Sequence, residues 1–197
     1  MTDESSLREV LQEATDAMHR SLDLQFEAFD LATLAGYECF LQAHAIAADT
    51  YDVPLSEFCI EQLDCRSPSY ERAITLDLKE IGQPALEGRS AAPGIQLETP
   101  SQAAGMAYVV LGSRLGTAHL ANEYCGKIKA FRPDLNLHFM TDRGGINCWR
   151  SFIAWQKKAV FSAHQIDEAV ESAGETFALF ADAARQVSEN LQPTRAG

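Results

Sequence analysis

Two glycines stand four residues apart in an apolar part of the chain. Gly112 and Gly116 lie in the segment Tyr108-Val109-Val110-Leu111-Gly112-Ser113-Arg114-Leu115-Gly116. The periodicity of this segment predicts a helix, in which each interior glycine costs about 1 kcal/mol relative to alanine. A helix carries that cost where it must bend or where its backbone must come close to something else. The close neighbour is either a second helix or a flat ligand, and the sequence leaves both alternatives open.

His19 is the second residue that could do chemistry. At about 100° per residue it lies about 120° around the first predicted helix from Leu7, and about 60° from Leu22. It therefore stands at the border of the apolar stripe. A histidine in that place can direct one ring nitrogen into a crevice while the other finds an internal acceptor. Judged on position alone, an ordinary hydrogen-bonded border histidine is the commoner interpretation.

The remaining histidines form no recognisable site. His119 and Glu123 are four residues apart and could share one helix face. The sequence lacks the paired Glu-x-x-His motifs that di-iron helical bundles use, so this pair is interpreted as a surface pair or as a neighbour of the glycine segment. His44 and His138 have no clear partners and are interpreted as ordinary.

The cysteines favour a reducing compartment. Their number is odd, their spacing is wide and no C-x-x-C occurs, which argues against a zinc knuckle or a redox pair. We expect reduced and mostly buried thiols. The five are Cys39, Cys59, Cys65, Cys125 and Cys148.

Composition excludes several classes of protein. The chain has 197 residues, of which 46% are hydrophobic and 22% charged, so a disordered chain is excluded and one domain with a sizeable core is expected. Acidic residues outnumber basic ones 28 to 16, giving a net charge of -12, which disfavours nucleic acids and anionic membranes as partners. The first residues are acidic rather than a basic leader, and no apolar run reaches the length of a membrane span. We expect a soluble, cytoplasmic protein.

The hydrophobic periodicity is helical nearly throughout, with no alternating strand pattern. It predicts an all-α domain of six to eight helices over residues 1–197, with frayed ends at 1–5 and 191–197. The expected helices begin at the Ser6 capping box, after Thr33 (ending near Tyr51), at Pro54, at the Ser69 cap (ending at Gly82), at Thr99-Pro100 (ending near Cys125, with Gly126 as its stop), around Trp149, and at the Ser162 capping box. Irregular chain is expected from Gly88 to Gln96 and from Phe131 to Gly145.

The two chemical features together resemble one family. The stretch from Leu11 to Asp23, with Glu13-Ala14-Thr15 ahead of His19, resembles the first helix of heme oxygenases, in which such a segment leads to the histidine that ligates heme iron. The glycine segment resembles their distal helix, especially the form found in bacterial enzymes associated with bacteriophytochromes. Further similarity at Gly36 to Leu41, at Trp149 to Phe152 and at the Phe177/Phe180 pair extends the resemblance over nearly the whole chain.

The resemblance implies a fold and an activity. The fold would be a single compact multi-helix domain, with heme between the first helix and a kinked, glycine-containing distal helix. The activity would be cleavage of heme to biliverdin with release of iron and CO, and heme would serve as both substrate and cofactor. The reaction would need O₂ and an external electron donor, a ferredoxin or a flavoprotein reductase, and a bacteriophytochrome could accept the bilin.

The resemblance also implies roles for particular residues. His19 would be the axial ligand of the heme iron, since a neutral imidazole leaves the opposite face able to bind O₂. The distal face would be formed by Gly112, Ser113, Gly116 and Thr117. Cationic partners of the heme propionates would be Arg20, Arg150 and Lys157.

Three positions depart from the family pattern. Ser113 stands where many members have an aspartate, although serine is frequent in the bacteriophytochrome-associated type. Leu111 stands where bacterial members often have glutamate, and Thr117 replaces a second consecutive glycine. These departures leave two alternatives open: a heme-binding carrier with little turnover, or a non-heme member of the same fold.

Overall fold

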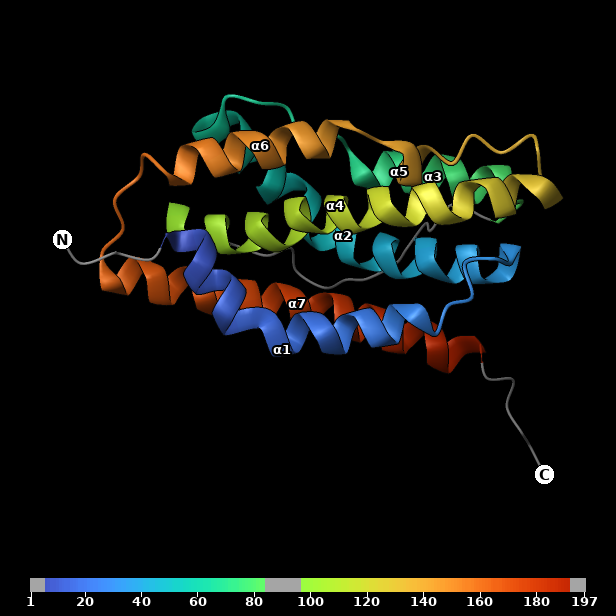
Figure 1. Ribbon diagram of the computed structural model, residues 1–197, viewed down its shortest axis with the longest axis horizontal. Helices are drawn as coiled ribbons and strands as arrows, with labels where there is room; N and C mark the ends of the chain where they lie inside the picture. Colours follow the sequence, from blue (N-terminus) through green and yellow to red (C-terminus); the bar gives the residue numbers. More distant parts are fainter. Residues whose placement is uncertain (1–5, 84–96, 192–197) are drawn as a thin grey trace.

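The structure, a computed structural model, describes residues 6–83 and 97–191, and it is helical without strands in these parts of the chain (Figure 1). The predicted all-α class is confirmed. The helices are α1 (Leu7–Glu27), α2 (Leu34–Leu63), α3 (Tyr70–Glu80), α4 (Pro100–Phe131), α5 (His138–Thr141), α6 (Gly144–Gln156) and α7 (Ala163–Leu191).

Helix α4 occupies the centre of the molecule. It packs against α7, α6, α2 and α5, while α1 packs mainly along α7 (Figure 1). In Figure 1, α1 and α7 run side by side on one side of α4, and α6 lies on the other. The central helix is therefore the one that carries the glycine segment.

Five of the predicted helix starts are confirmed, those at Ser6, Thr33, Ser69, Thr99 and Ser162. Ser6 and Glu9 form a capping box at α1, in which the Glu9 carboxylate accepts a hydrogen bond of 2.7 Å from the backbone N–H of Ser6. Thr99 forms the same arrangement at α4, and Ser69 caps α3 by accepting from a backbone N–H. At Ser162 the backbone N–H donates to the Gln165 side chain at 2.9 Å, which completes the last predicted box. Side chains thus satisfy backbone N–H groups that have no partner within a helix.

The predicted break at Pro54 is wrong. Helix α2 continues through this proline to Leu63. Proline removes one backbone hydrogen bond, but the helix beyond it is held by burial. Leu55 is 0% exposed and Phe58 is 4% exposed. Tertiary packing thus offsets a local penalty that the sequence pattern alone overestimates.

The predicted stop at Gly126 is also wrong, because α4 continues to Phe131, shortly before Pro133. Ile128, which is 2% exposed, anchors the added turn. The stretch from 131 to 145 is not wholly irregular: it holds the short helix α5, and Gly144 begins α6. The loop expected from Gly88 to Gln96 lies outside the described residues.

No helix among residues 6–83 and 97–191 combines the length and the apolar character that crossing a membrane requires.

Candidate functional site

A cavity of about 380 Å³ is bordered mainly by α1 and α4. This volume lies within the range that small-molecule sites usually occupy. Its border is mostly apolar and aromatic, with a few polar groups. The lining residues are Arg8, Gln12, His19, Leu22, Asp23 and Phe26 of α1; Phe40 and His44 of α2; Tyr108, Val109, Gly112, Ser113, Leu115, Gly116, Thr117 and Leu120 of α4; Trp149 of α6; and Phe177 and Phe180 of α7.

The glycines of α4 face this cavity rather than a second helix. A Cβ placed on Gly116 would meet nothing within 4 Å, and one on Gly112 would meet only the Trp149 ring, at 3.5 Å. That distance is ordinary van der Waals contact, so neither glycine is required by the approach of another backbone. Of the two alternatives that the sequence left open, packing against a neighbouring helix finds no support at these two positions. The structure instead puts bare backbone on the border of the cavity.

His19 reaches the same cavity from α1. Its side chain is 63% exposed, and its Nε2 lies 3.6 Å from the carboxylate of Asp23, one turn further along the helix. Its ring is tilted against that of Phe177, with ring centroids 5.8 Å apart. A carboxylate beside an imidazole can hold one ring nitrogen while the other binds a metal. His19 therefore places an imidazole on the cavity border, with the Asp23 carboxylate within ion-pair distance of its Nε2.

The two hydroxyl side chains of the distal segment also line the cavity, and both are tied to their own helix. Ser113 donates a hydrogen bond of 2.8 Å to the Val110 carbonyl, and Thr117 donates one of 3.1 Å to the Ser113 carbonyl. Each hydroxyl oxygen retains lone pairs that can accept a hydrogen bond. The predicted distal residues are thus brought together, with their hydroxyl protons directed to helix carbonyls.

Arg114 is a buried cation next to this segment that sequence reasoning missed. It is 3% exposed, lies 3.4 Å from Thr117 Oγ1 through Nη1, and donates through Nη2 to the Phe139 carbonyl. The guanidinium carbon lies 4.4 Å from the centre of the Phe139 ring and 5.0 Å from that of Tyr70. Its Nε has no partner in the described residues. The local sequence does not show that this arginine faces inward. Apolar residues occur on several sides of this part of α4, so they do not single out one buried face.

His44 is the second residue that the sequence did not reveal. It lies 7% exposed on the cavity border, with Nδ1 2.9 Å from the Phe40 carbonyl, and it packs against several aromatic rings. Burial, with the nearby Arg114 charge as a lesser cause, lowers the pKa of His44 to about 3, although the hydrogen bond to Phe40 opposes the shift. The imidazole is therefore neutral at neutral pH. The sequence signal that could have found it is its helical phase, four residues after Phe40.

The basic residues fall differently from the expectation. Arg20 pairs with Asp16 on the surface of α1, Arg150 lies 3.4 Å from Asn147 Oδ1, and Lys157 caps the end of α6. None of the three borders the cavity, whereas Arg8 of α1 does. The structure therefore offers Arg8 as the cation at the cavity itself.

His119 and Glu123 lie on the exposed surface of α4, as expected for a surface pair, and Glu123 pairs with Lys127 at 3.4 Å. Among the cysteines, the structure confirms burial for Cys39, Cys59 and Cys148.

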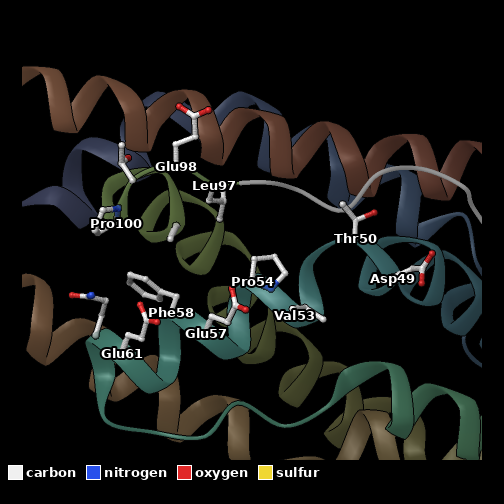
Figure 2. A pocket seen from close by; sticks show the side chains of 13 residues that line it. Asp49, Thr50, Val53, Pro54, Glu57, Phe58, Glu61, Leu97, Glu98 and Pro100 are labelled. Carbon is white, nitrogen blue, oxygen red and sulfur yellow. The ribbon is translucent and has the colours of Figure 1, made fainter.

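A second hollow, of about 610 Å³, lies between α2 and the start of α4 (Figure 2). Figure 2 shows Glu57 and Glu61 of α2 and Glu98 before α4 on its border, together with Phe58 and Pro54. The described residues on its border include carboxylates but no histidine, lysine or arginine. This hollow is larger than the first, yet it would repel an anionic ligand and offers no imidazole for a metal. The cavity between α1 and α4 is therefore the candidate site.

Comparison with solved structures finds a similar fold. The chain is similar to the NO- and CO-bound heme oxygenase from Neisseria meningitidis, with a TM-score of 0.72, 21% sequence identity, and coverage of 92% of each chain. No family model matches the sequence. No curated protein matches it either. The likeness establishes the heme-oxygenase fold predicted from the sequence.

Proposed function

We propose that this protein is a heme oxygenase, which binds heme in the cavity between α1 and α4 and opens it to biliverdin, releasing iron and CO. One observation carries the proposal: His19 on α1 and the glycine face of α4 border the same largely apolar cavity. The heme-oxygenase fold of the chain supports it.

The residues present fit heme. A flat macrocycle needs apolar walls, and rings of Phe177, Phe180 and Trp149 line the cavity. It also needs space, and the open position of Gly116 leaves room that any Cβ would take. His19 would supply a neutral nitrogen ligand, and the Asp23 carboxylate lies 3.6 Å from its Nε2. When heme is bound, its iron supplies the site at which O₂ is held and reduced.

The protein's own residues would orient the substrate and hold water. Ser113 and Thr117 can accept hydrogen bonds from water molecules, because their own protons are committed to helix carbonyls. Arg114 places a positive charge beside Thr117, which favours negative charge developing nearby. Arg8 is the cation placed to meet a propionate. Arg20, Arg150 and Lys157 would contribute only from outside the cavity border.

The first experiment tests axial ligation. Heme is titrated into the protein and into the variants His19→Ala and His164→Ala, and the complex is followed by absorption and electron paramagnetic resonance. His164 is a matched control, since its Nε2 lies 3.8 Å from Glu168 one helical turn on, much as His19 faces Asp23. We expect His19→Ala to lose the imidazole-ligated spectrum and regain it with added imidazole, while His164→Ala behaves as wild type. Unchanged ligation in His19→Ala would refute the assignment of His19, and failure of the wild type to form an imidazole-ligated complex would favour a non-heme member of the fold.

The second experiment tests turnover. With heme, O₂ and a reductant, we expect the Soret band to decay, a biliverdin spectrum to appear, and one CO to form for each heme. A stable complex would favour the alternative function of a heme carrier. One observation supports that alternative, because Thr117 adds a branched side chain to the cavity border where the family pattern has glycine.

The proposal extends to partners. Electrons would come from a ferredoxin or a flavoprotein reductase in the cytoplasm, and a bacteriophytochrome would accept the bilin. The support for the bilin acceptor is the form of the glycine segment around Ser113, which resembles the bacteriophytochrome-associated type.

A further inference from the structure

We propose that Cys59, Cys65 and Cys148 form a thiolate site for a soft monovalent metal ion, Cu(I). The three sulfur atoms all lie within 4.8 Å of one another, and the Sγ atoms of Cys65 and Cys148 are 2.8 Å apart. None of the three residues borders the proposed heme cavity. The proposed copper site is therefore separate from the proposed heme site, and each can be tested without the other.

The end of α2 brings two of these thiols together. Asp64 caps the helix in the left-handed region, with φ of 48°, and the backbone N–H of Cys65 donates to the Cys59 carbonyl at 3.1 Å. The backbone N–H of Asp64 donates to the same carbonyl, and this six-to-one hydrogen bond is the one that folds a chain back over the last turn of a helix. Local backbone geometry thus fixes Cys65 above Cys59, although five residues separate them in sequence.

The third thiol comes from α6, which packs against α2. Cys148 donates to the Arg66 carbonyl at 3.3 Å, and this contact connects α6 to the residue that follows Cys65. Cys59 is 0% exposed and Cys148 is 1% exposed, whereas Cys65 is partly exposed. Two of the three residues are therefore buried, and the partly exposed Cys65 gives an ion a path from solvent.

The donor set selects the metal. A metal–sulfur bond of about 2.3 Å places the sulfurs of a three-coordinate ion roughly 4 Å apart, a spacing that the cluster reaches when the partly exposed Cys65 moves away from Cys148. Structural zinc almost always takes four ligands, and the described residues supply three. Cu(I) is soft, favours thiolates, and is satisfied by two or three of them.

The other cluster of potential ligands in the described residues differs in kind. Asp77, Glu80 and His138 also have ligand atoms within 4.8 Å of one another. Asp77, however, already accepts hydrogen bonds from the Tyr37 hydroxyl and from the backbone N–H groups of His138 and Phe139. The Asp77 carboxylate oxygens are thus engaged in hydrogen bonds that join α3 to α2 and α5, so we interpret this cluster as stabilising the fold rather than binding a metal ion.

The experiment measures Cu(I) affinity of the full chain, prepared without heme or metal and kept reduced and free of oxygen. Cu(I) is titrated in competition with the chromogenic chelator bicinchoninate. We expect one equivalent to be withdrawn from the chelator, together with a sulfur-to-copper absorption band. Cys59→Ser, Cys65→Ser and Cys148→Ser are each expected to weaken binding by about 100-fold or more.

Two matched variants control for loss of a cysteine as such. Cys39→Ser removes a buried thiol of α2, and Cys125→Ser a partly exposed thiol of α4, and neither should change the Cu(I) affinity. Circular dichroism monitors folding, and Cys65→Ser keeps the test decisive if the buried replacements unfold the protein. The proposal is overturned if no equivalent is withdrawn, if the cluster variants bind as wild type does, or if Zn(II) displaces Cu(I). It is equally overturned if Cys65 and Cys148 oxidise to a disulfide in air while the reduced protein holds no copper.

Discussion

Two stretches of α4 use glycine for opposite reasons. Near its start, a Cβ on Gly105 would lie 2.0 Å from the Ala169 carbonyl oxygen of α7, so glycine there allows two backbones to touch. In its middle, a Cβ on Gly116 would meet nothing within 4 Å. The first glycine is required by packing, whereas packing does not explain the second. The proposed binding of a flat ligand would account for a glycine that packing does not require on the border of a cavity.

The comparison predicts that the largest change in stability follows substitution of Gly105, near the start of α4. Gly105→Ala drives a methyl group into the backbone of Ala169, which is itself fully buried. We expect the free energy of unfolding to fall by about 3 kcal/mol or more. Urea unfolding followed by circular dichroism measures the change. An unchanged midpoint would mean that α4 and α7 can separate without cost, and would contradict the distinction between the two stretches.

A second effect is expected at the cavity, through His44. Its folded-state pKa of about 3 lies below the value of about 6.5 expected for an unfolded chain. Between these two values the unfolded state binds a proton that the folded state does not. This difference lowers the free energy of unfolding by about 1.4 kcal/mol for each unit that the pH falls from 6.5 towards 3. Above pH 6.5 the contribution is constant.

His44→Phe removes this titration while keeping an aromatic ring in place. Urea unfolding at several pH values should show a shallower loss of stability in acid than in the wild type. His164→Ala, which removes an exposed histidine, should keep the full slope. If stability falls equally steeply with pH in the wild type and in His44→Phe, the pKa of His44 is not lowered in the folded state.

The smallest effect on stability is expected at the open glycines, with the opposite sign to Gly105. Gly116→Ala should raise the free energy of unfolding by up to about 1 kcal/mol, since alanine favours helix and meets no neighbour. Gly112→Ala should behave similarly, because its methyl makes only ordinary contact with Trp149. Heme affinity should fall about tenfold in both, equivalent to about 1.4 kcal/mol. A gain in stability with undiminished heme affinity would argue against the ligand requirement.

The class of fold and most helix starts could be predicted from the sequence, because both are local. Ser6, Thr99 and Ser162 act on backbone groups within one turn, so their pattern is sufficient. The ends of α2 and α4 could not be predicted in the same way. Pro54 and Gly126 are local penalties, and the structure overrides them with burial contributed by residues distant in sequence.

The residues of the candidate site show the same difference between local sequence signals and contacts with distant residues. His19 and the glycines were identified because their types and spacing are unusual within a helix, and the structure puts both on one cavity. Arg114 and His44 were missed because their significance depends on neighbours from other helices, such as Phe139. The cluster formed with Cys148 depends likewise on α6 meeting the end of α2.

The guanidinium of Arg114, which lies beside Thr117, has one more consequence. Titration does not remove the charge of an arginine under conditions in which proteins stay folded. Whatever reaction takes place in the adjoining cavity would therefore meet the same positive neighbour in mild acid and in mild base. Any acid limb or alkaline limb in its rate would then originate in the ligand, in water, or in another ionisable side chain on the cavity border, while the charge of Arg114 stays constant.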